Sequence, residues 1–294
     1  MRTKRNAGWI GGCLLGLCLG LIGGALGVQI FSPDDAISQK KTPSFPMEWK
    51  LGSNFYMQTA AEYRASCLQI YKCATLRLEA LLKANPTAYP QPAVVMDLDE
   101  TVFDNSTFET FLHQAHAEYS DSLWGRYEKN YFEEVMLVPG AKNFIAQAAN
   151  SGVTVYYISN RSEEHRSSTI KALAHLGIDT TNISSRLGLK KKGESSDKTL
   201  RREKATARYN VLFYFGDNLR DFSETFAVPK LPAGDHVAQL AEIERRYAQV
   251  DAADCHWGVD WFVLPNPVYG EWEKLLGEQP MLKLRATKMK FPGK

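Results

Sequence analysis

An apolar run that ends in two carboxylates constrains this chain more than any other stretch. Residues 94–105 read VVMDLDETVFDN, so Asp97 and Asp99 come directly after a short Val/Met run. Such a run predicts a buried strand, and side chains two residues apart on a strand point to the same side unless the chain turns. Two carboxylates together repel each other and lose hydration unless a cation or substrate compensates them. The string therefore predicts a metal-assisted site with an acidic nucleophile, at the sheet edge where open α/β folds bind ligands.

The rest of the chain alternates between helical and strand-like patterns. Helical spacing predicts one or two amphipathic helices over 51–83, an aromatic-rich helical stretch over 103–132, and helices over 141–150, 163–176 and 198–208. Short apolar runs predict strands over 93–97, 153–159, 211–215 and 261–264. Strands separated by helices predict an α/β fold with a Rossmann-like, doubly wound parallel sheet.

Three of these predicted strands end in polar clusters. Asp97 and Asp99 follow the first, the SNR string at 159–161 ends the second, and Asp217 with Asp221 follows the third. In a parallel sheet the three clusters meet at one edge. Four carboxylates facing one pocket require a divalent cation, and hard oxygen ligands favour Mg²⁺ over zinc.

This set of residue types suits phosphoryl transfer. A metal-bound aspartate can attack phosphorus and form an acyl phosphate, and a second carboxylate can protonate the leaving oxygen and later deprotonate water. A serine hydroxyl and a lysine ammonium can hold the phosphoryl oxygens. Simpler interpretations stay open from the residues alone: Asp217 as a turn residue or helix cap, Ser159 and Asn160 as a cap, and Lys198 as a solvated charge.

The motifs together resemble a known superfamily. DLDET, SNR, a later lysine and GDNLRDF are similar to the four-motif signature of the haloacid dehalogenase superfamily of phosphatases. TVFDNS, WGRYEK, the PGA string at 139–141 and LPNPVYGEWE resemble the bacterial class C acid phosphatases, exported lipoproteins also described as 5′-nucleotidases. The likeness covers residues 49–276 and implies a small helical cap and N-terminal helices beside the sheet.

The resemblance implies a role for each acidic residue. Asp97 corresponds to the nucleophile and a metal ligand, and Asp99 to the general acid/base, whose backbone carbonyl also binds the metal. Asp217 corresponds to the second side-chain ligand, and Asp221 to the residue that holds the water shell of the metal.

The same resemblance implies how the substrate is held. Ser159 matches the hydroxyl that binds the phosphoryl group, with Asn160 and Arg161 beside it as substrate-binding residues. Lys198 fits the lysine of the third motif best, although residues 190–192 are also lysines and compete for that role.

Aromatic residues complete the implied substrate site. Trp124 and Tyr269 match positions whose rings flank an aromatic base, which forms a stacking slot tolerant of many bases. Tyr127 stands where a second tryptophan is expected. The alternative for Trp124 is ordinary packing of a helix against the core.

The N-terminus predicts export. Arg2, Lys4 and Arg5 precede an uncharged Gly/Leu-rich run over 7–31, which exceeds the about 20 apolar residues that a bilayer requires. A cleaved signal peptide, an uncleaved anchor and lipid attachment at Cys13 or Cys18 all remain open, and a buried core helix is the less favoured alternative. The expected location is periplasmic, or membrane-attached and facing out of the cytoplasm.

The domain organisation follows from these segments. We expect a signal peptide or anchor over 1–31, a linker over 32–47, the phosphatase domain over 48–280 with a helical cap near 103–138, and a basic tail over 281–294. Cys67, Cys73 and Cys255 form neither a disulfide framework nor a zinc spacing. Oligomeric state and the role of residues 222–260 stay open.

These observations combine into one functional hypothesis. The chain is expected to be an exported, Mg²⁺-dependent acid phosphatase that hydrolyses nucleoside 5′-monophosphates through an aspartyl phosphate. A net charge of +2 does not favour a nucleic-acid polymer as partner, and the resemblance implies a small phosphomonoester as the substrate. The alternatives are a broad sugar or aryl phosphate phosphatase, and a non-catalytic membrane-tethered binding protein.

Overall fold

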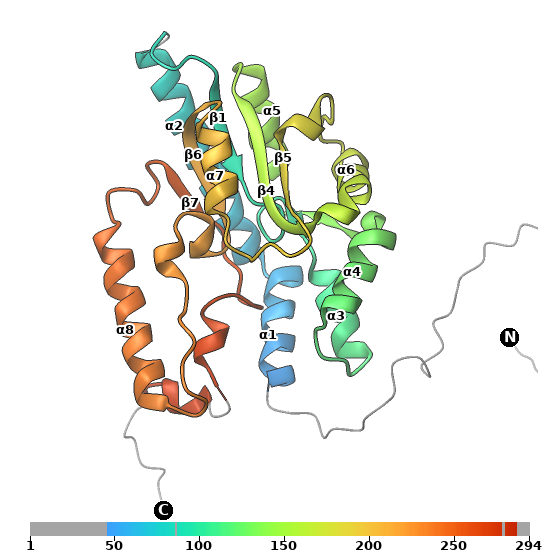
Figure 1. The fold of residues 1–294 in the computed structure, drawn as a ribbon, viewed down its shortest axis with the longest axis vertical. Helices are drawn as coiled ribbons and strands as arrows, with labels where there is room; N and C mark the ends of the chain where they lie inside the picture. Colours follow the sequence, from blue (N-terminus) through green and yellow to red (C-terminus); the bar gives the residue numbers. More distant parts are fainter. Residues whose placement is uncertain (1–45, 86, 278–279, 287–294) are drawn as a thin grey trace, which may run out of the picture. The chain divides into compact units, whose positions relative to one another are not determined.

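A five-stranded parallel sheet forms the centre of the described chain (Figure 1). The computed structural model describes residues 46–85, 87–277 and 280–286. Neighbouring strands follow the order β5–β4–β1–β6–β7, and every pair in this sheet is parallel. The strands are β1 (Pro92–Met96), β4 (Thr154–Ser162), β5 (Leu187–Lys190), β6 (Asn210–Gly216) and β7 (Trp261–Val263). The predicted doubly wound sheet is confirmed.

The strand order reverses at β1. The chain runs outward from β1 through β4 to β5, and then returns to the other side of β1 for β6 and β7. Open α/β sheets bind ligands beyond the carboxyl ends of the strands at such a switch point. The strand β5 was not predicted, because its four residues LGLK contain a glycine and run directly into a lysine-rich stretch.

Helices cover both faces of the sheet, because successive strand residues point to opposite sides. Val94 and Met96 belong to the main core, together with buried residues of α2 (Ala61–Ala84) and α5 (Ala141–Asn150). Val95 lies in a separate small cluster with Ala205 of α7 (Thr199–Thr206). A further helix, α6 (Arg166–His175), adds Ala172 and Leu173 to the main core.

Helix α2 packs against the first motif, DLDET, and supports it. Its buried residues recur at helical spacing, and among them Tyr71 donates its hydroxyl to the backbone oxygen of Thr101 at 2.6 Å. Gly140 adopts a positive φ of 95° directly before α5, and a Cβ there would approach the Tyr71 ring to 3.0 Å. The turn at the PGA string is therefore fixed both by backbone conformation and by close packing.

The expected N-terminal helices are present. Helix α1 (Pro46–Thr59) precedes α2, and Ala60 separates them with an extended backbone conformation. Because α1 begins at Pro46, it takes in the last two positions of the predicted linker. No helix within the described ranges is long and apolar enough to cross a membrane. The predicted segment at 7–31 lies outside those ranges.

The region after the first motif is a small cap of two helices and a two-stranded antiparallel sheet. A continuous helical stretch over 103–132 was expected, but the chain first forms β2 (Phe103–Asp104), which pairs antiparallel with β3 (Met136–Leu137). Helices α3 (Ser106–Gln114) and α4 (Asp121–Asn130) follow and are separated by a loop. His116 in that loop has a positive φ of 48°, and Ser120 accepts a capping bond from the N–H of Leu123, so the helix restarts there.

The C-terminal part contains one long helix and several short ones. The stretch over 222–260, which had no predicted role, contains α8 (His236–Ala252), and Arg245 on this helix pairs with Glu242. The remaining short helices are of the 3₁₀ type: η2 (Phe132–Glu134), η3 (Glu163–His165), η4 (Ile183–Arg186), η5 (Leu219–Asp221), η6 (Glu224–Phe226), η7 (Glu273–Leu275) and η8 (Pro280–Lys283).

Candidate active site

The polar clusters of the sequence meet at the carboxyl edge of the sheet. Asp97 follows β1, Ser159 lies near the end of β4, and Asp217 follows β6. The backbone N–H of Asp97 still bonds to the carbonyl of Phe215 at 2.9 Å, and the chain then turns at residues 98–101. Glu100 in this turn has a positive φ of 52°. Because of the turn, Asp97 and Asp99 do not continue as strand neighbours.

Three carboxylates converge beside β1 and β6. One oxygen each from Asp97, Asp217 and Asp221 lies within 4.8 Å of the others. Lys198, from the segment before α7, donates to Asp97 Oδ1 and to Asp221 Oδ1 at 2.6 Å each. A Cβ on Gly216 would overlap the Asp221 side chain, so this glycine allows Asp221 to fold back over the strand end.

Lys198 is thus the lysine that reaches the carboxylates. It is buried, whereas of the three competing lysines Lys190 is half-buried at the end of β5 and Lys191 and Lys192 are exposed. Burial alone would lower the pKa of Lys198, but the carboxylates of Asp221 and Asp97 raise it above its ordinary value. The lysine therefore stays a cation between the two aspartates.

The charge balance of the cluster leaves negative charge unmatched. Burial raises the pKa of Asp97 well above its ordinary value, against the opposing effect of Lys198. Burial and repulsion from Asp221 raise the pKa of Asp217 to about 7. These carboxylates are therefore under-compensated by Lys198 alone.

The donor set fits a divalent metal ion. It consists of carboxylate oxygens, the ligands that hard cations prefer, and they lie close enough together to share one ion. A bound cation would supply the positive charge that the buried cluster lacks. Asp97, Asp217 and Asp221 are the residues that would hold it.

Asp99 belongs to a different network. Its Oδ1 accepts bonds from Arg161 Nε at 2.8 Å and from Asn105 Nδ2 at 2.9 Å, and its Oδ2 accepts one from Ser159 Oγ at 3.2 Å. Ser159 Oγ in turn accepts the backbone N–H of Arg161 at 3.0 Å. Asp99, Ser159 and Arg161 are thus brought together, beside the cluster formed by Asp97, Asp217 and Asp221.

Comparison with known proteins accounts for this arrangement. The model of the HAD superfamily subfamily IIIB acid phosphatases matches residues 34–272. The chain belongs to this family of acid phosphatases. It is a phosphomonoesterase, and the recognition made from the motifs is confirmed.

Two solved structures are similar over most of the chain. The class C acid phosphatase from Bacillus anthracis with tungstate bound shares 30% identity and a TM-score of 0.66, covering 78% of this chain and 89% of that one. A second structure of the class C acid phosphatase from Bacillus anthracis shares 29% identity and the same TM-score of 0.66, covering 79% and 89%.

Some predicted substrate residues of this phosphatase are engaged within the protein. Arg161 is 1% exposed, so it lies behind Asp99 rather than on the surface. The side chain of Asn160 accepts from Arg201 Nη2 at 2.7 Å and donates to the carbonyl of Ser196 at 3.2 Å. Arg201 also donates to the carbonyl of Ser159 at 2.5 Å. The structure does not bring the Asn160 side chain to the carboxylates.

The aromatic residues lie on two sides of the site. Trp124 on α4 packs against Tyr127 and Phe108, with ring centroids 5.4 Å and 5.2 Å away, and lies 5.5 Å from the Arg161 guanidinium. Tyr127 is buried and donates its hydroxyl to Asn105 Oδ1 at 3.2 Å. Tyr127 therefore supports the acid network from within.

Tyr269 is connected to the carboxylate cluster through its loop. Asn266, in the loop after β7, accepts from the backbone N–H of Tyr269 at 3.3 Å and donates to Asp217 Oδ2 at 2.8 Å. Sequence reasoning assigned no role to Asn266 or to Asn105. Both lie in strings that carry the family resemblance, LPNPVYGEWE and TVFDNS, which is the signal that could have found them.

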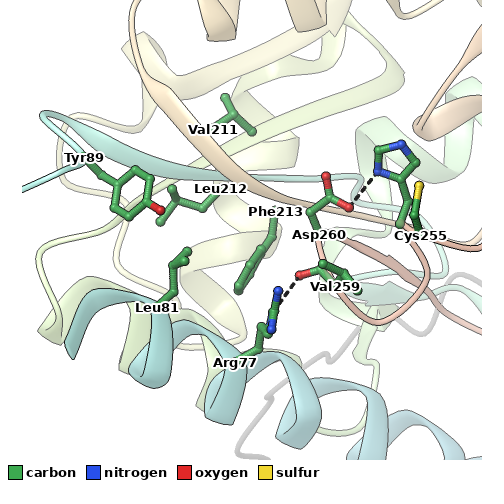
Figure 2. A pocket seen from close by; sticks show the side chains of 10 residues that line it. Arg77, Leu81, Tyr89, Val211, Leu212, Phe213, Cys255, Val259 and Asp260 are labelled. Atoms are coloured by element: carbon green, nitrogen blue, oxygen red, sulfur yellow. Dashed lines mark hydrogen bonds and ion pairs between the residues drawn. The ribbon is translucent and has the colours of Figure 1, made fainter. Parts of the chain in front are cut away.

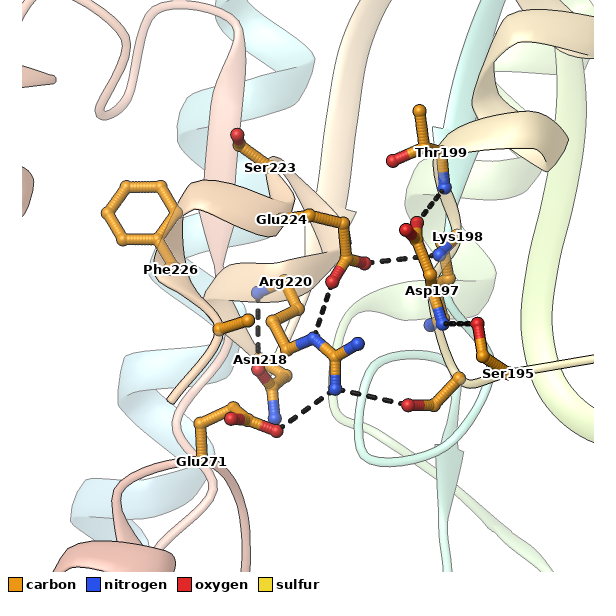
Figure 3. A network of polar contacts seen from close by, with 12 residues as sticks. Ser195, Asp197, Lys198, Thr199, Asn218, Arg220, Ser223, Glu224, Phe226 and Glu271 are labelled. Atoms are coloured by element: carbon orange, nitrogen blue, oxygen red, sulfur yellow. Dashed lines mark hydrogen bonds and ion pairs between the residues drawn. The ribbon is translucent and has the colours of Figure 1, made fainter. Parts of the chain in front are cut away.

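A polar network holds the lysine segment in place (Figure 3). Arg220 on η5 donates to Glu224 at 2.7 Å, to Glu271 at 3.1 Å and to Ser196 at 3.1 Å. The other carboxylate oxygen of Glu224 accepts the backbone N–H of Lys198 at 3.1 Å. One arginine therefore connects the segment before α7 with the C-terminal segment that follows Tyr269.

A cavity of about 360 Å³ lies at the opposite edge of the sheet (Figure 2). Leu212 and Phe213 near the start of β6, Val259 and Asp260 before β7, and Arg77 on α2 are among its lining residues. Because the catalytic candidates all follow the carboxyl ends of strands, this cavity is separate from them and takes no part in the phosphatase site.

Proposed function

We propose that this acid phosphatase is an exported, Mg²⁺-dependent enzyme that hydrolyses nucleoside 5′-monophosphates through an aspartyl-phosphate intermediate. One observation carries the proposal. The two aspartates of DLDET lie in different networks, Asp97 with Lys198 and the metal-binding carboxylates, and Asp99 with Arg161, Asn105 and Ser159. Two carboxylates with separate surroundings suit two separate catalytic roles.

Asp97 acts as the nucleophile. Its carboxylate attacks the phosphorus, and the bond between phosphorus and the leaving oxygen breaks. Lys198, fixed between Asp97 and Asp221, stabilises negative charge on the transferring group. The hydroxyl of Ser159, which donates to Asp99 Oδ2 in the structure, turns to donate to a phosphoryl oxygen when the substrate binds.

Asp99 moves the proton. It protonates the leaving oxygen as the alcohol departs, and it then takes a proton from the water that hydrolyses the aspartyl phosphate. Arg161 and Asn105 both donate to Oδ1, whereas Oδ2 accepts from Ser159, whose hydrogen turns to the phosphoryl group. Oδ2 is therefore the oxygen with capacity left for proton transfer.

Asp97, Asp217, Asp221 and the backbone carbonyl of Asp99 would hold Mg²⁺. When bound, the ion neutralises the phosphoryl oxygens and orients the substrate. The tungstate bound in the Bacillus anthracis relative supports an oxyanion site in this family, since tungstate, like phosphate, is a tetrahedral oxyanion.

The aromatic residues support a nucleotide as substrate. Trp124 lies on the cap beside Arg161, and Tyr269 lies in the loop bonded to Asp217 through Asn266. A base stacked on an aromatic ring gains about 1–3 kcal/mol. One observation favours the broader sugar or aryl phosphatase instead: the Trp124 ring is already packed against Phe108 and Tyr127.

Steady-state kinetics of the full-length protein separate these two functions. We expect chelation to abolish activity and added Mg²⁺ to restore it. Trp124→Ala should lower kcat/KM for a nucleoside monophosphate by about 10- to 100-fold, the loss of one stacked base, and should leave a sugar phosphate nearly unchanged. Trp257→Ala is the matched control. Trp257 precedes β7 and packs against Phe222 and Trp261, so its loss removes a tryptophan without removing the proposed stacking ring. An equal loss for both substrates would favour the broad phosphatase.

Export is proposed from the N-terminal sequence alone. The basic residues followed by the uncharged run at 7–31 support translocation with the phosphatase domain outside the cytoplasm. The intact mass of the native protein tests this, since a cleaved, a lipidated and an unprocessed terminus differ in mass.

A further inference from the structure

Asn105 occupies a position where its side chain would ordinarily cap a helix. It directly precedes α3, and asparagine at such a position usually accepts a bond from a backbone N–H of the first turn. Within the described chain its side chain makes no such bond. Asp104 accepts the N–H of Ser106 at 2.9 Å instead. The side chain of Asn105 therefore does not cap α3 and is free to bond elsewhere.

That use is a complete set of four hydrogen bonds. Nδ2 donates to Asp99 Oδ1 at 2.9 Å and to Glu100 Oε1 at 3.1 Å. Oδ1 accepts from Tyr127 at 3.2 Å and from Arg161 Nη2 at 3.0 Å. An amide has two donor hydrogens and two acceptor lone pairs, so its capacity is filled.

The amide can adopt only one orientation. A flip would place its oxygen against the oxygens of Asp99 and Glu100, and its NH₂ group against the guanidinium of Arg161. The backbone N–H of Asn105 also donates to Glu100 Oε1 at 2.9 Å, and the residue is 1% exposed. Asn105 is therefore a rigid connection between α4, β4 and the turn that carries Asp99.

We propose that Asn105 is a positioning residue that fixes the Asp99 carboxylate so that Oδ2 faces the leaving oxygen. Asn105 and Arg161 both donate to Oδ1. These two bonds prevent the Asp99 side chain from rotating. The inference rests on the proposed proton-transfer role of Asp99 and adds the residue that sets its geometry.

Dependence on the leaving group tests the proposal in the full-length protein. An alkyl phosphate needs protonation of its leaving oxygen, whereas an activated aryl phosphate with an acidic phenol needs it far less. General acid catalysis contributes about 10²–10⁴-fold. We expect Asn105→Ala to lower kcat/KM for the alkyl phosphate about 10-fold more than for the aryl phosphate.

Asn54→Ala is the matched control. Asn54 is also a buried asparagine; it lies on α1 and bonds to α3, where it donates to the carbonyl of Ser106 and to Thr110 Oγ1. Its loss should lower stability and leave the ratio of the two substrates unchanged. An equal fall for both substrates in Asn105→Ala would overturn the proposal.

Two further variants keep the test decisive. Tyr127→Phe removes one of the donors to Asn105 Oδ1 and should change the ratio in the same direction but less; if Asn105→Ala does not fold, an unchanged ratio in Tyr127→Phe overturns the proposal. Asp99→Asn distinguishes the two levels of the argument. If this variant lowers kcat/KM equally for both substrates, the proton-transfer role of Asp99 fails, whereas a selective fall in kcat/KM for the alkyl phosphate in Asp99→Asn without one in Asn105→Ala overturns the positioning role alone.

Discussion

The guanidinium of Arg161 donates from Nε to Asp99 Oδ1 at 2.8 Å, and the Arg161 side chain is fully buried. The same guanidinium lies 4.8 Å from the Phe103 ring. The buried Arg161 therefore holds the Asp99 carboxylate in a fixed orientation. The rigid, planar guanidinium can do this, whereas the flexible ammonium group of a lysine cannot.

Arg161→Lys should accordingly be a damaging substitution. It removes the bond to Asn105 or the one to Asp99, and breaking a buried ion pair costs about 3–5 kcal/mol. We expect a lower urea midpoint and a fall in kcat. Arg166→Lys is the control, because Arg166 makes a similar pair with Glu163 that is partly exposed and away from the carboxylates. Equal effects of both variants on kcat would contradict the special position of Arg161.

Asp97→Asn should abolish turnover while the fold survives. The amide keeps the size of the side chain but cannot form the aspartyl phosphate. Activity should fall by several orders of magnitude, and circular dichroism should remain that of the unmodified protein. Asp99→Asn should instead slow hydrolysis of the aspartyl phosphate, so that the phosphoenzyme accumulates and is detectable by intact mass after acid quenching. Activity retained in Asp97→Asn would exclude Asp97 as the nucleophile.

Asp217 should make the metal-free protein less stable as the pH rises. Its pKa is raised from 3.8 to about 7, so the folded state binds this proton more tightly than the unfolded state. The resulting stabilisation is fully present below pH 3.8 and is lost as the pH rises through about 7. Urea midpoints of chelated protein across this range should fall, and Asp217→Asn should flatten the slope. Exposed Asp254→Asn should leave the slope unchanged, and added Mg²⁺ should restore stability at neutral pH.

Arg220→Ala should weaken substrate binding more than it weakens folding. The change releases Ser196, Glu224 and Glu271 together, so the Lys198 and Tyr269 segments lose their common anchor. We expect KM to rise several-fold. Arg245→Ala, which breaks a similar pair with Glu242 on α8, should leave KM unchanged. An unchanged KM in Arg220→Ala would mean that the two segments are held independently.

Cys67 should be inert toward alkylation in the native protein. It is completely buried, and burial raises the pKa of its thiol to about 11, so little of the reactive thiolate is present at pH 8. Cys73 and Cys255 are exposed and should react. Peptide mapping after labelling, with and without urea, measures each site. Labelling of Cys67 at the rate of Cys255 without urea would show that α2 opens readily.

Four strands of the sheet were predictable, because each is an apolar run bounded by turn residues. Strand β5 was not, since its four residues alternate between buried and half-buried positions and include Gly188. The single helical stretch expected over 103–132 was wrong in part. Residues 103–104 form a strand because Phe103 pairs with Leu137, which lies 34 residues further along the chain. A local sequence pattern cannot reveal such a contact.

The carboxylates of the site were predictable from their position after strands, whereas their supporting amides were not. Lys198 had a solvated charge as its simplest interpretation, and only the fold shows it between Asp97 and Asp221. Asn105 and Asn266 have the residue type of ordinary turn residues. Their function depends on partners far away in the sequence, such as Arg161 and Asp217.

The order of the strands has a consequence for folding. The site draws on Asp97 after the central strand and on Asn266 after the last one, and contacts across such sequence separations form late and slowly. A chain that has assembled β1, β4 and β5 alone has Asp97, Asp99 and Ser159 but lacks Asp217 and Asn266. Enzymatic activity should therefore require the complete sheet, including its final strand.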